Sequence, residues 1–112
     1  GELQKPETPN AVKLELFIFD ALPLAKNPLI LEADRLEEFS PVKNKTGVDS
    51  LESLQADLNK RAQKWLTAAG ITIEDNALIE LSTRSFTCQQ DVIAKASQFP
   101  TVIEAGQTIY FD

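Results

Sequence analysis

The sequence contains no histidine and no methionine, and it has only one cysteine among 112 residues. Without histidine, the thiol of Cys88 lacks the base that usually activates a cysteine nucleophile, so we interpret Cys88 as a small, semi-buried side chain. A single cysteine also excludes an internal disulfide and fits a reducing compartment, which favours a cytoplasmic protein. Because the chain starts at Gly1 and has no methionine, we expect it to be a piece of a longer polypeptide.

Glycine is also scarce. The four glycines stand at positions 1, 47, 70 and 106, too far apart to form a glycine-rich loop around a triphosphate. No close group of carboxylates has the spacing of metal ligands, so the sequence predicts no metal site within this chain.

An excess of positive charge is lacking as well. The chain has 11 Lys and Arg against 17 Asp and Glu, a net charge of -6, which argues against nonspecific nucleic-acid binding. No apolar run approaches the length of a membrane helix. The 43% of apolar residues and 25% of charged residues are typical of a globular protein, and 112 residues suffice for one modest domain. No internal repeat is evident.

The first strong pattern is an apolar, β-branched and aromatic run from Val12 to Phe19. Its last four residues are apolar on both faces, which predicts a strand covered on both sides, as in the central sheet of an α/β domain. We expect part of that cover to come from residues outside this chain. Leu29 to Ala33, which follows Pro28, is a second and shorter strand candidate.

A long amphipathic helix is predicted after residue 50. Its apolar stripe consists of Leu51, Leu54, Leu58, Ala62, Trp65, Leu66 and Ala69. Asp49 with Glu52 forms a candidate capping box, and Gly70 is a natural C-terminal stop. A tryptophan on such a stripe is predicted to lie in the core.

The remainder predicts a small α+β appendage packed against this helix. Short strands are expected over residues 71–73, 77–81, 101–104 and 108–111. A short helix is expected over Val92 to Ser97, with Thr87 or Gln89 near its start and Pro100 beyond its end.

One loop places a lysine in a constrained position. Within Glu37 to Asn44, Pro41 fixes its own φ and favours extended geometry at Ser40, which directs the chain towards Lys43. Side-chain hydrogen bonds from Ser40 and Asn44 are expected to orient this loop. Local sequence alone favours an ordinary solvated lysine, and Glu37 with Glu38 is read as a solvated acidic turn rather than a metal site.

Three stretches together resemble a known family. They are Lys13 to Asp20 (K-L-E-L-F-I-F-D), Glu37 to Asn44 (E-E-F-S-P-V-K-N) and the helix end Trp65 to Gly70 (W-L-T-A-A-G). This arrangement is similar to the C-terminal part of the UDP-N-acetylglucosamine pyrophosphorylases and related UDP-sugar pyrophosphorylases. The resemblance is good over residues 11–70 and weak beyond residue 81, where Glu80 to Phe86 lack the proline, tyrosine and glycines of the family pattern.

The resemblance implies a fold and a division of the chain. Its α/β fold would comprise the last strands of a nucleotide-binding Rossmann-like sheet, the long helix and a small β-rich C-terminal appendage. Residues 1–47 would belong to the catalytic nucleotidyltransferase domain, and residues 48–112 would form the helix and a small α+β domain.

The resemblance also implies an activity, in which UTP and a sugar 1-phosphate give a UDP-sugar and pyrophosphate. Lys13 would contact the UTP phosphates, Lys43 would act on the sugar-linked phosphate as the catalytic residue, and Asn44 would orient the loop. Asp20 is expected to hold a loop rather than to act in catalysis. Mg²⁺ would be bound mainly by residues outside this chain.

Several alternatives remain open at this point. N-acetylglucosamine 1-phosphate is the expected sugar substrate, with UDP-glucose or broad UDP-sugar synthesis as the alternative. We expect the chain to be inactive alone, to require the N-terminal catalytic part of the same enzyme, and to form a homodimer through its exposed apolar run. A non-catalytic interaction module and a free-standing small domain are the alternatives from other classes. No nucleic acid or membrane partner is expected.

Overall fold

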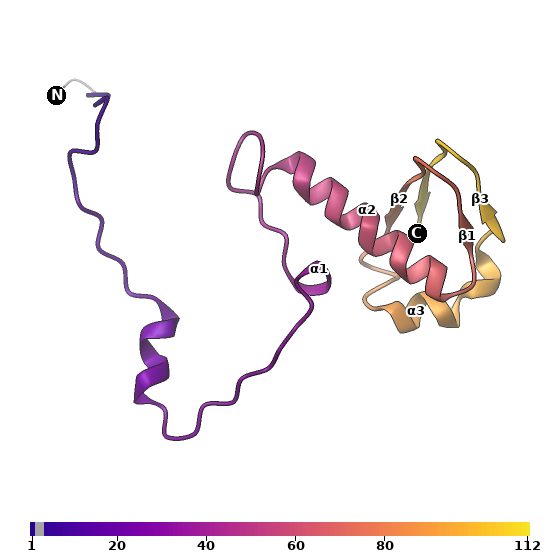
Figure 1. The fold of residues 1–112 in the computed structure, drawn as a ribbon, viewed down its shortest axis with the longest axis horizontal. Coiled ribbons are helices and arrows are strands. Elements are labelled where there is room, and N and C mark those ends of the chain that lie inside the picture. Colours follow the sequence, from indigo (N-terminus) through magenta and orange to yellow (C-terminus); the bar gives the residue numbers. More distant parts are fainter. Residues whose placement is uncertain (2–3) are drawn as a thin grey trace. The chain divides into compact units, whose positions relative to one another are not determined.

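The computed structural model describes Gly1 and residues 4–112, and these divide into two compact units. The first unit is Gly1–Glu32 and the second is Ala33–Asp112 (Figure 1). The predicted assignment of residues 1–47 and 48–112 to two domains of a larger enzyme stays a prediction.

The first unit has little regular structure. Among the residues described in this unit, the one regular element is a 3-10 helix, Ile18–Leu24, with Pro23 inside it. The carboxylate of Asp20 accepts a hydrogen bond of 3.1 Å from the Phe17 N–H and caps this helix. Such a local hydrogen-bonding role is the one predicted for Asp20.

The two strands predicted in the N-terminal part are not formed. Val12 to Phe17 precede the 3-10 helix without regular structure, and Leu29 to Ala33 are likewise irregular. A strand is stable only when its backbone N–H and C=O groups pair with a neighbouring strand. Among the residues described here, none pairs with either segment, so the apolar pattern that favoured a strand is present without its hydrogen-bonded ladder.

The second unit is built on a long helix, α2 (Leu51–Ala68). The prediction of this helix is confirmed, and Gly70 follows it at φ +88°, a left-handed conformation that ends helices at low cost when glycine adopts it. The predicted cap is wrong by one residue. Ser50 is the N-cap and forms a capping box with Ser53, because Asp49 has φ +56° whereas an N-cap residue needs extended backbone.

Before α2 the chain forms one short helix and a loop. Helix α1 (Arg35–Glu38) starts at Asp34, whose carboxylate accepts a hydrogen bond of 3.0 Å from the Leu36 N–H. Residues 39–50 then connect α1 to α2, and the two helices pack against each other.

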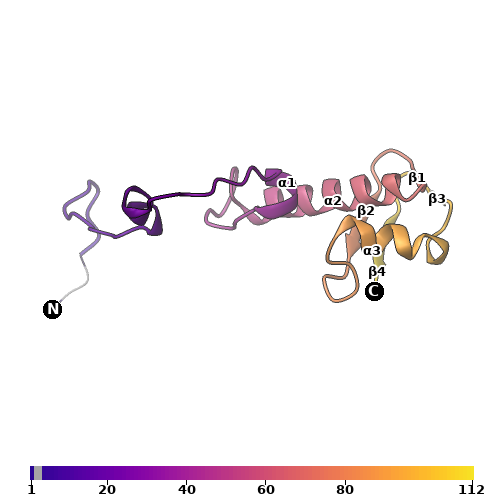
Figure 2. The same ribbon diagram turned by 90° about the horizontal axis from the view of Figure 1, so that it is seen from below.

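After α2 the chain forms two pairs of parallel strands. Strand β1 (Thr72–Ile73) pairs with β3 (Val102–Ile103), and β2 (Leu78–Leu81) pairs with β4 (Thr108–Phe111). The four predicted strands are therefore confirmed, and so is the mixed α/β fold class. Parallel neighbours require a long crossover, which here contains α3 (Gln89–Ala94) and a 3-10 helix, Ala96–Gln98. Figure 2 shows α2, α3 and the strands gathered at the C-terminal end of the chain.

The pairing reveals an internal repeat that the sequence reading missed. Every paired residue meets the residue 30 positions later, as Thr72 meets Val102 and Leu81 meets Phe111. The turns between the strands also correspond, with Asn76 at φ +60° and Gly106 at φ +71°. Residues 71–82 and 101–112 are thus two copies of one strand-turn-strand unit stacked in register.

The core of the second unit lies between α2, α3 and the strands. Its buried apolar residues are Ala62, Trp65, Leu66, Ile71, Ala77, Ile79, Phe86, Val92, Phe99 and Ile103. The predicted core position of Trp65 is confirmed, since only 4% of the residue is exposed. Leu51 and Leu58 of the predicted stripe are 57% and 37% exposed, and Cys88 is exposed rather than semi-buried.

Candidate functional site

The loop that carries Lys43 is closed by backbone hydrogen bonds. The N–H groups of Lys43 and Asn44 both donate to the carbonyl of Asp49, at 2.7 and 2.9 Å. The Asn44 side-chain amide donates to the Val48 carbonyl at 2.7 Å. Gly47, at φ +80°, supplies the turn that such a return requires. The backbone of Lys43 is therefore held in place by its own loop.

This loop is also joined to the start of α2. The hydroxyl of Ser50, which is fully buried, donates to the carbonyl of Gly47 at 2.7 Å and accepts from the Ser53 N–H at 3.3 Å. A single serine thus caps the helix and fastens the loop that precedes it.

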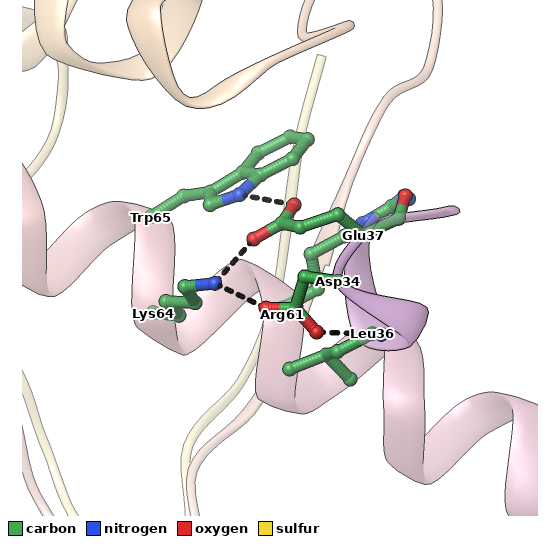
Figure 3. Close-up of polar contacts among 6 residues, drawn as sticks. All are labelled: Asp34, Leu36, Glu37, Arg61, Lys64 and Trp65. Carbon is green, nitrogen blue, oxygen red and sulfur yellow. Dashed lines mark hydrogen bonds and ion pairs between the residues drawn. The ribbon is translucent and has the colours of Figure 1, made fainter. Parts of the chain in front are cut away.

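The segment before the loop is held against the side of α2. One carboxylate oxygen of Glu37 accepts a hydrogen bond from the Lys64 ammonium at 2.7 Å, and the other accepts from Trp65 Nε1 at 2.9 Å. Lys64 also donates to the Asp34 carboxylate at 3.0 Å. Figure 3 shows the side chains of Asp34 and Glu37 converging on Lys64, with the indole nitrogen directed at Glu37. We call the group Asp34, Glu37, Lys64 and Trp65 the clasp.

The ionised forms of Asp34 and Lys64 in the clasp stabilise each other. The hydrogen bond from Lys64, followed by that from the Leu36 N–H, lowers the pKa of Asp34 below its ordinary value. The hydrogen bonds to Glu37 and then to Asp34 raise the pKa of Lys64. The guanidinium of Arg61 lies 4.9 Å from the Trp65 ring centroid, a cation–π contact that adds to the packing of this tryptophan.

A separate hydrogen bond joins the loop to the middle of α2. The hydroxyl of Ser40 donates to the carboxylate of Asp57 at 2.7 Å, and both side chains lie in a partly buried position. Hydrogen bonds to a carboxylate are shorter and stronger than those between neutral groups. Ser40 was predicted to orient the Lys43 loop, and the structure gives its partner as a helix side chain rather than a backbone group.

The predicted site residues lie in both units. Lys13 lies in the first unit, where its ammonium pairs with Glu15. Lys43 and Asn44 lie in the second unit, and the Lys43 side chain is exposed. Among the contacts of the described residues, the Lys43 ammonium makes no hydrogen bond or ion pair, so its charge is available to a ligand.

Sequence reasoning missed the clasp and the role of Asp57. Glu37 had been interpreted as a solvated carboxylate, yet it binds both Lys64 and Trp65. The available signal was the tryptophan itself, because a buried indole N–H needs an acceptor. The sequence does not say which acceptor is used, since Glu37 lies 28 residues before Trp65.

The described residues do not by themselves fit a magnesium site. Across Gly1 and residues 4–112, no group of three or more acidic, cysteine or histidine side chains is placed to hold a metal ion. The two carboxylates that come together, those of Asp34 and Glu37, both bind Lys64. Within the described part of the chain, no helix is long and apolar enough to span a membrane.

Comparison with known proteins places these features in context. A probable UDP-N-acetylglucosamine pyrophosphorylase of Caenorhabditis elegans is 48% identical over 68 residues, which cover 59% of this chain and 14% of that protein. A UDP-N-acetylglucosamine pyrophosphorylase of Saccharomyces cerevisiae is 42% identical over 89 residues, which cover 75% of this chain and 18% of that protein. A mouse UDP-N-acetylhexosamine pyrophosphorylase-like protein 1 is 36% identical over 87 residues.

The chain therefore spans less than a fifth of the length of these curated relatives. No family model matches it.

Proposed function

Because this chain corresponds to a segment of the UDP-N-acetylglucosamine pyrophosphorylase family, we propose that it is the C-terminal part of a UTP:sugar-1-phosphate uridylyltransferase. The reaction joins UTP and N-acetylglucosamine 1-phosphate into a UDP-sugar and releases pyrophosphate. The names of the relatives, which specify N-acetylglucosamine or N-acetylhexosamine, favour this sugar over glucose.

The observation that carries the proposal is that Lys43 has a fixed backbone and an exposed side chain. Its backbone N–H is bound to the Asp49 carbonyl at 2.7 Å, while its side chain is exposed. In uridylyl transfer, the sugar 1-phosphate oxygen attacks the α-phosphorus of UTP and pyrophosphate leaves from the opposite side. Negative charge gathers around that phosphorus, and a lysine whose backbone is already fixed brings its ammonium group to that charge with less reorganisation.

Each of the predicted site residues has a part in this proposal. Lys43 contacts the sugar-linked phosphate, and Lys13 contacts the phosphates of UTP. Asn44 holds the loop closed through its hydrogen bond to the Val48 carbonyl. The ion pair of Lys13 with Glu15 has to open when Lys13 binds phosphate, and such exposed pairs open at little cost.

The partners of the chain follow from the same proposal. It requires the N-terminal catalytic part of the same enzyme, which would supply the glycine-rich UTP loop and the ligands of Mg²⁺. The chain alone is inactive, because its four dispersed glycines form no such loop. The single cysteine supports a cytoplasmic location.

The test is Lys43→Ala in the complete enzyme, with Lys45→Ala as the matched control. Lys45 is an exposed lysine in the same loop to which we assign no phosphate contact. Loss of one charge-assisted contact in the transition state is expected to cost about 2–4 kcal/mol, or roughly 30-fold to 1000-fold in kcat/KM. Lys45→Ala is expected to retain activity. Unchanged turnover in Lys43→Ala would exclude the proposed role of Lys43.

A non-catalytic interaction module is the second candidate. It is favoured by the exposed apolar side chains of the first unit, among them Leu16 and Leu29 at 96% and 95% exposure. Such a module has no need of Lys43, so the same substitution separates the two candidates.

A further inference from the structure

We propose that Ser40, Asp57 and Glu37 are positioning residues that set the backbone position from which Lys43 reaches the phosphate, an inference that rests on the proposed role of Lys43. None of the three would touch substrate. They would act by fixing the arm of the loop before Lys43 against helix α2.

The Lys43 loop is fastened before the lysine and at the lysine itself. Before the lysine, the Ser40 hydroxyl is bound to Asp57 at 2.7 Å. At the lysine itself, the backbone N–H is bound to the Asp49 carbonyl at 2.7 Å. Only Pro41 and Val42 lie between these two anchors, and Pro41 has a fixed φ. Few backbone torsions are left that could move the Cα atom of Lys43.

On helix α2, the loop is anchored to Asp57. Asp57 lies in the interior of α2, where aspartate is a poorer helix former than the straight-chain residues. Its carboxylate makes one hydrogen bond among the described residues, and the donor is the Ser40 hydroxyl. Asp57 thus places the loop at a defined position along α2.

The arm before Ser40 is anchored through Glu37. The carboxylate of Glu37 binds Lys64 and Trp65, and its backbone carbonyl accepts from the Arg61 guanidinium at 3.5 Å. Trp65 is only 4% exposed and packs in the core. Glu37 therefore connects the loop to the buried core of the unit. A displacement of about 1 Å in a reacting group can reduce a rate by up to about 100-fold, so such anchoring has a catalytic consequence.

A double-mutant cycle in the complete enzyme distinguishes positioning from general stabilisation. Ser40→Ala is made alone and together with Lys43→Ala, and kcat/KM is measured at limiting N-acetylglucosamine 1-phosphate. If Ser40 acts through Lys43, Ser40→Ala lowers kcat/KM by about 10-fold to 100-fold when Lys43 is present. In the Lys43→Ala background the same change lowers it by less than about 2-fold, because the group being positioned is already absent.

Three further variants sharpen the cycle. Asp57→Ala is expected to match Ser40→Ala, and the two together are expected to lose no more than either one alone. Ser40→Thr keeps a hydroxyl and is expected to restore most of the activity. Ser97→Ala, an exposed serine far along the chain, is the matched control and is expected to have no effect.

The outcomes separate this inference from the proposed function. Equal losses from Ser40→Ala in both backgrounds, or no loss when Lys43 is present, overturn the positioning role and leave the role of Lys43 intact. Full activity of Lys43→Ala by itself overturns both. Thermal unfolding of every variant shows whether the fold is retained.

Discussion

The two units of this chain have similar shares of apolar residues, but the first unit leaves them exposed whereas the second buries many of them. In the first unit, Leu14, Leu16 and Leu29 are at least 90% exposed, whereas Leu66, Val92 and Ile103 of the second unit are fully buried. The second unit has a long helix and two strand pairs that cover one another. The first unit has an apolar run with no covering element of its own. Apolar pattern alone therefore does not make a core, because a core also needs a partner surface.

The most direct test of this difference between the units is to remove the first unit. We expect the full chain to self-associate, because exposed apolar side chains and unpaired backbone groups favour contact with a second copy. A chain of residues 33–112 is expected to be monomeric and to keep the circular dichroism of its helix. Light scattering over a concentration series measures the association of both chains, and far-ultraviolet circular dichroism measures the helix of the shorter one. A full chain that stays monomeric at high concentration would contradict the expectation.

The second test compares one leucine from each unit. Leu66→Ala removes a fully buried side chain and is expected to lower the free energy of unfolding by about 2–5 kcal/mol. Leu16→Ala, at 96% exposure, is the matched control and is expected to leave it unchanged within about 0.5 kcal/mol. Urea unfolding followed by circular dichroism provides the measurement. Equal effects would mean that the first unit has a core of its own.

A smaller effect is expected from Trp65→Phe, which keeps an aromatic ring in the core but removes the donor to Glu37. The lost hydrogen bond is expected to lower the free energy of unfolding by about 1 kcal/mol, in addition to the cost of the smaller ring. In a Glu37→Ala background the hydrogen-bond part should vanish, leaving only the ring. The same cost in both backgrounds would show that the bond contributes nothing.

The smallest effect concerns pH. The pKa of Asp34 is lowered in the folded state, so its contribution is present above its ordinary value of 3.8 and is lost as the pH falls through the folded-state value. The pKa of Lys64 is raised, so its contribution is present below its ordinary value of 10.5 and is lost as the pH rises through the folded-state value.

The measurement for this prediction is the urea midpoint of Lys64→Ala against the parent chain, with the exposed Lys60→Ala as control. Lys64→Ala is expected to lose less stability on acidification than the parent, because Asp34 no longer has its lysine. The pKa of Asp91 is also lowered, chiefly by its hydrogen bonds from Thr87, so part of the acid sensitivity should remain in both proteins. Identical acid sensitivity in all three would mean that the clasp adds nothing.

Sequence reasoning recovered the parts of the fold that depend on local pattern. The stripe of α2, its stop at Gly70 and the four short strands follow from spacing and turn residues within a few positions. The N-cap was missed because Asp49 and Ser50 are both good capping residues. The backbone conformation selects Ser50, and it cannot be inferred from the residue types alone. The prediction of a strand over Val12 to Phe19 was wrong because a strand depends on a partner, and the described residues provide none.

The site was less predictable than the fold. Lys43 has no distinguishing local signal, and only the resemblance of residues 37–44 to a family motif singled it out. The contacts that hold its loop join residues far apart, as Ser40 with Asp57 and Glu37 with Trp65. The repeat was missed because residues 71–82 and 101–112 share only a few identical pairs, such as Ile73 with Ile103 and Ile79 with Ile109.

The register of the two strand pairs has a consequence for how the protein is made. Each paired residue of β1 and β2 bonds with a strand that is synthesised 30 positions later. Neither strand pair can therefore form until its partner strand in the second copy of the repeat has left the ribosome. Helix α2 is complete well before then, with its apolar face still uncovered. During translation the nascent chain therefore passes through a stage in which helix α2 is complete but the strand pairs beside it are not, and synthesis of residues 101–112 ends that stage.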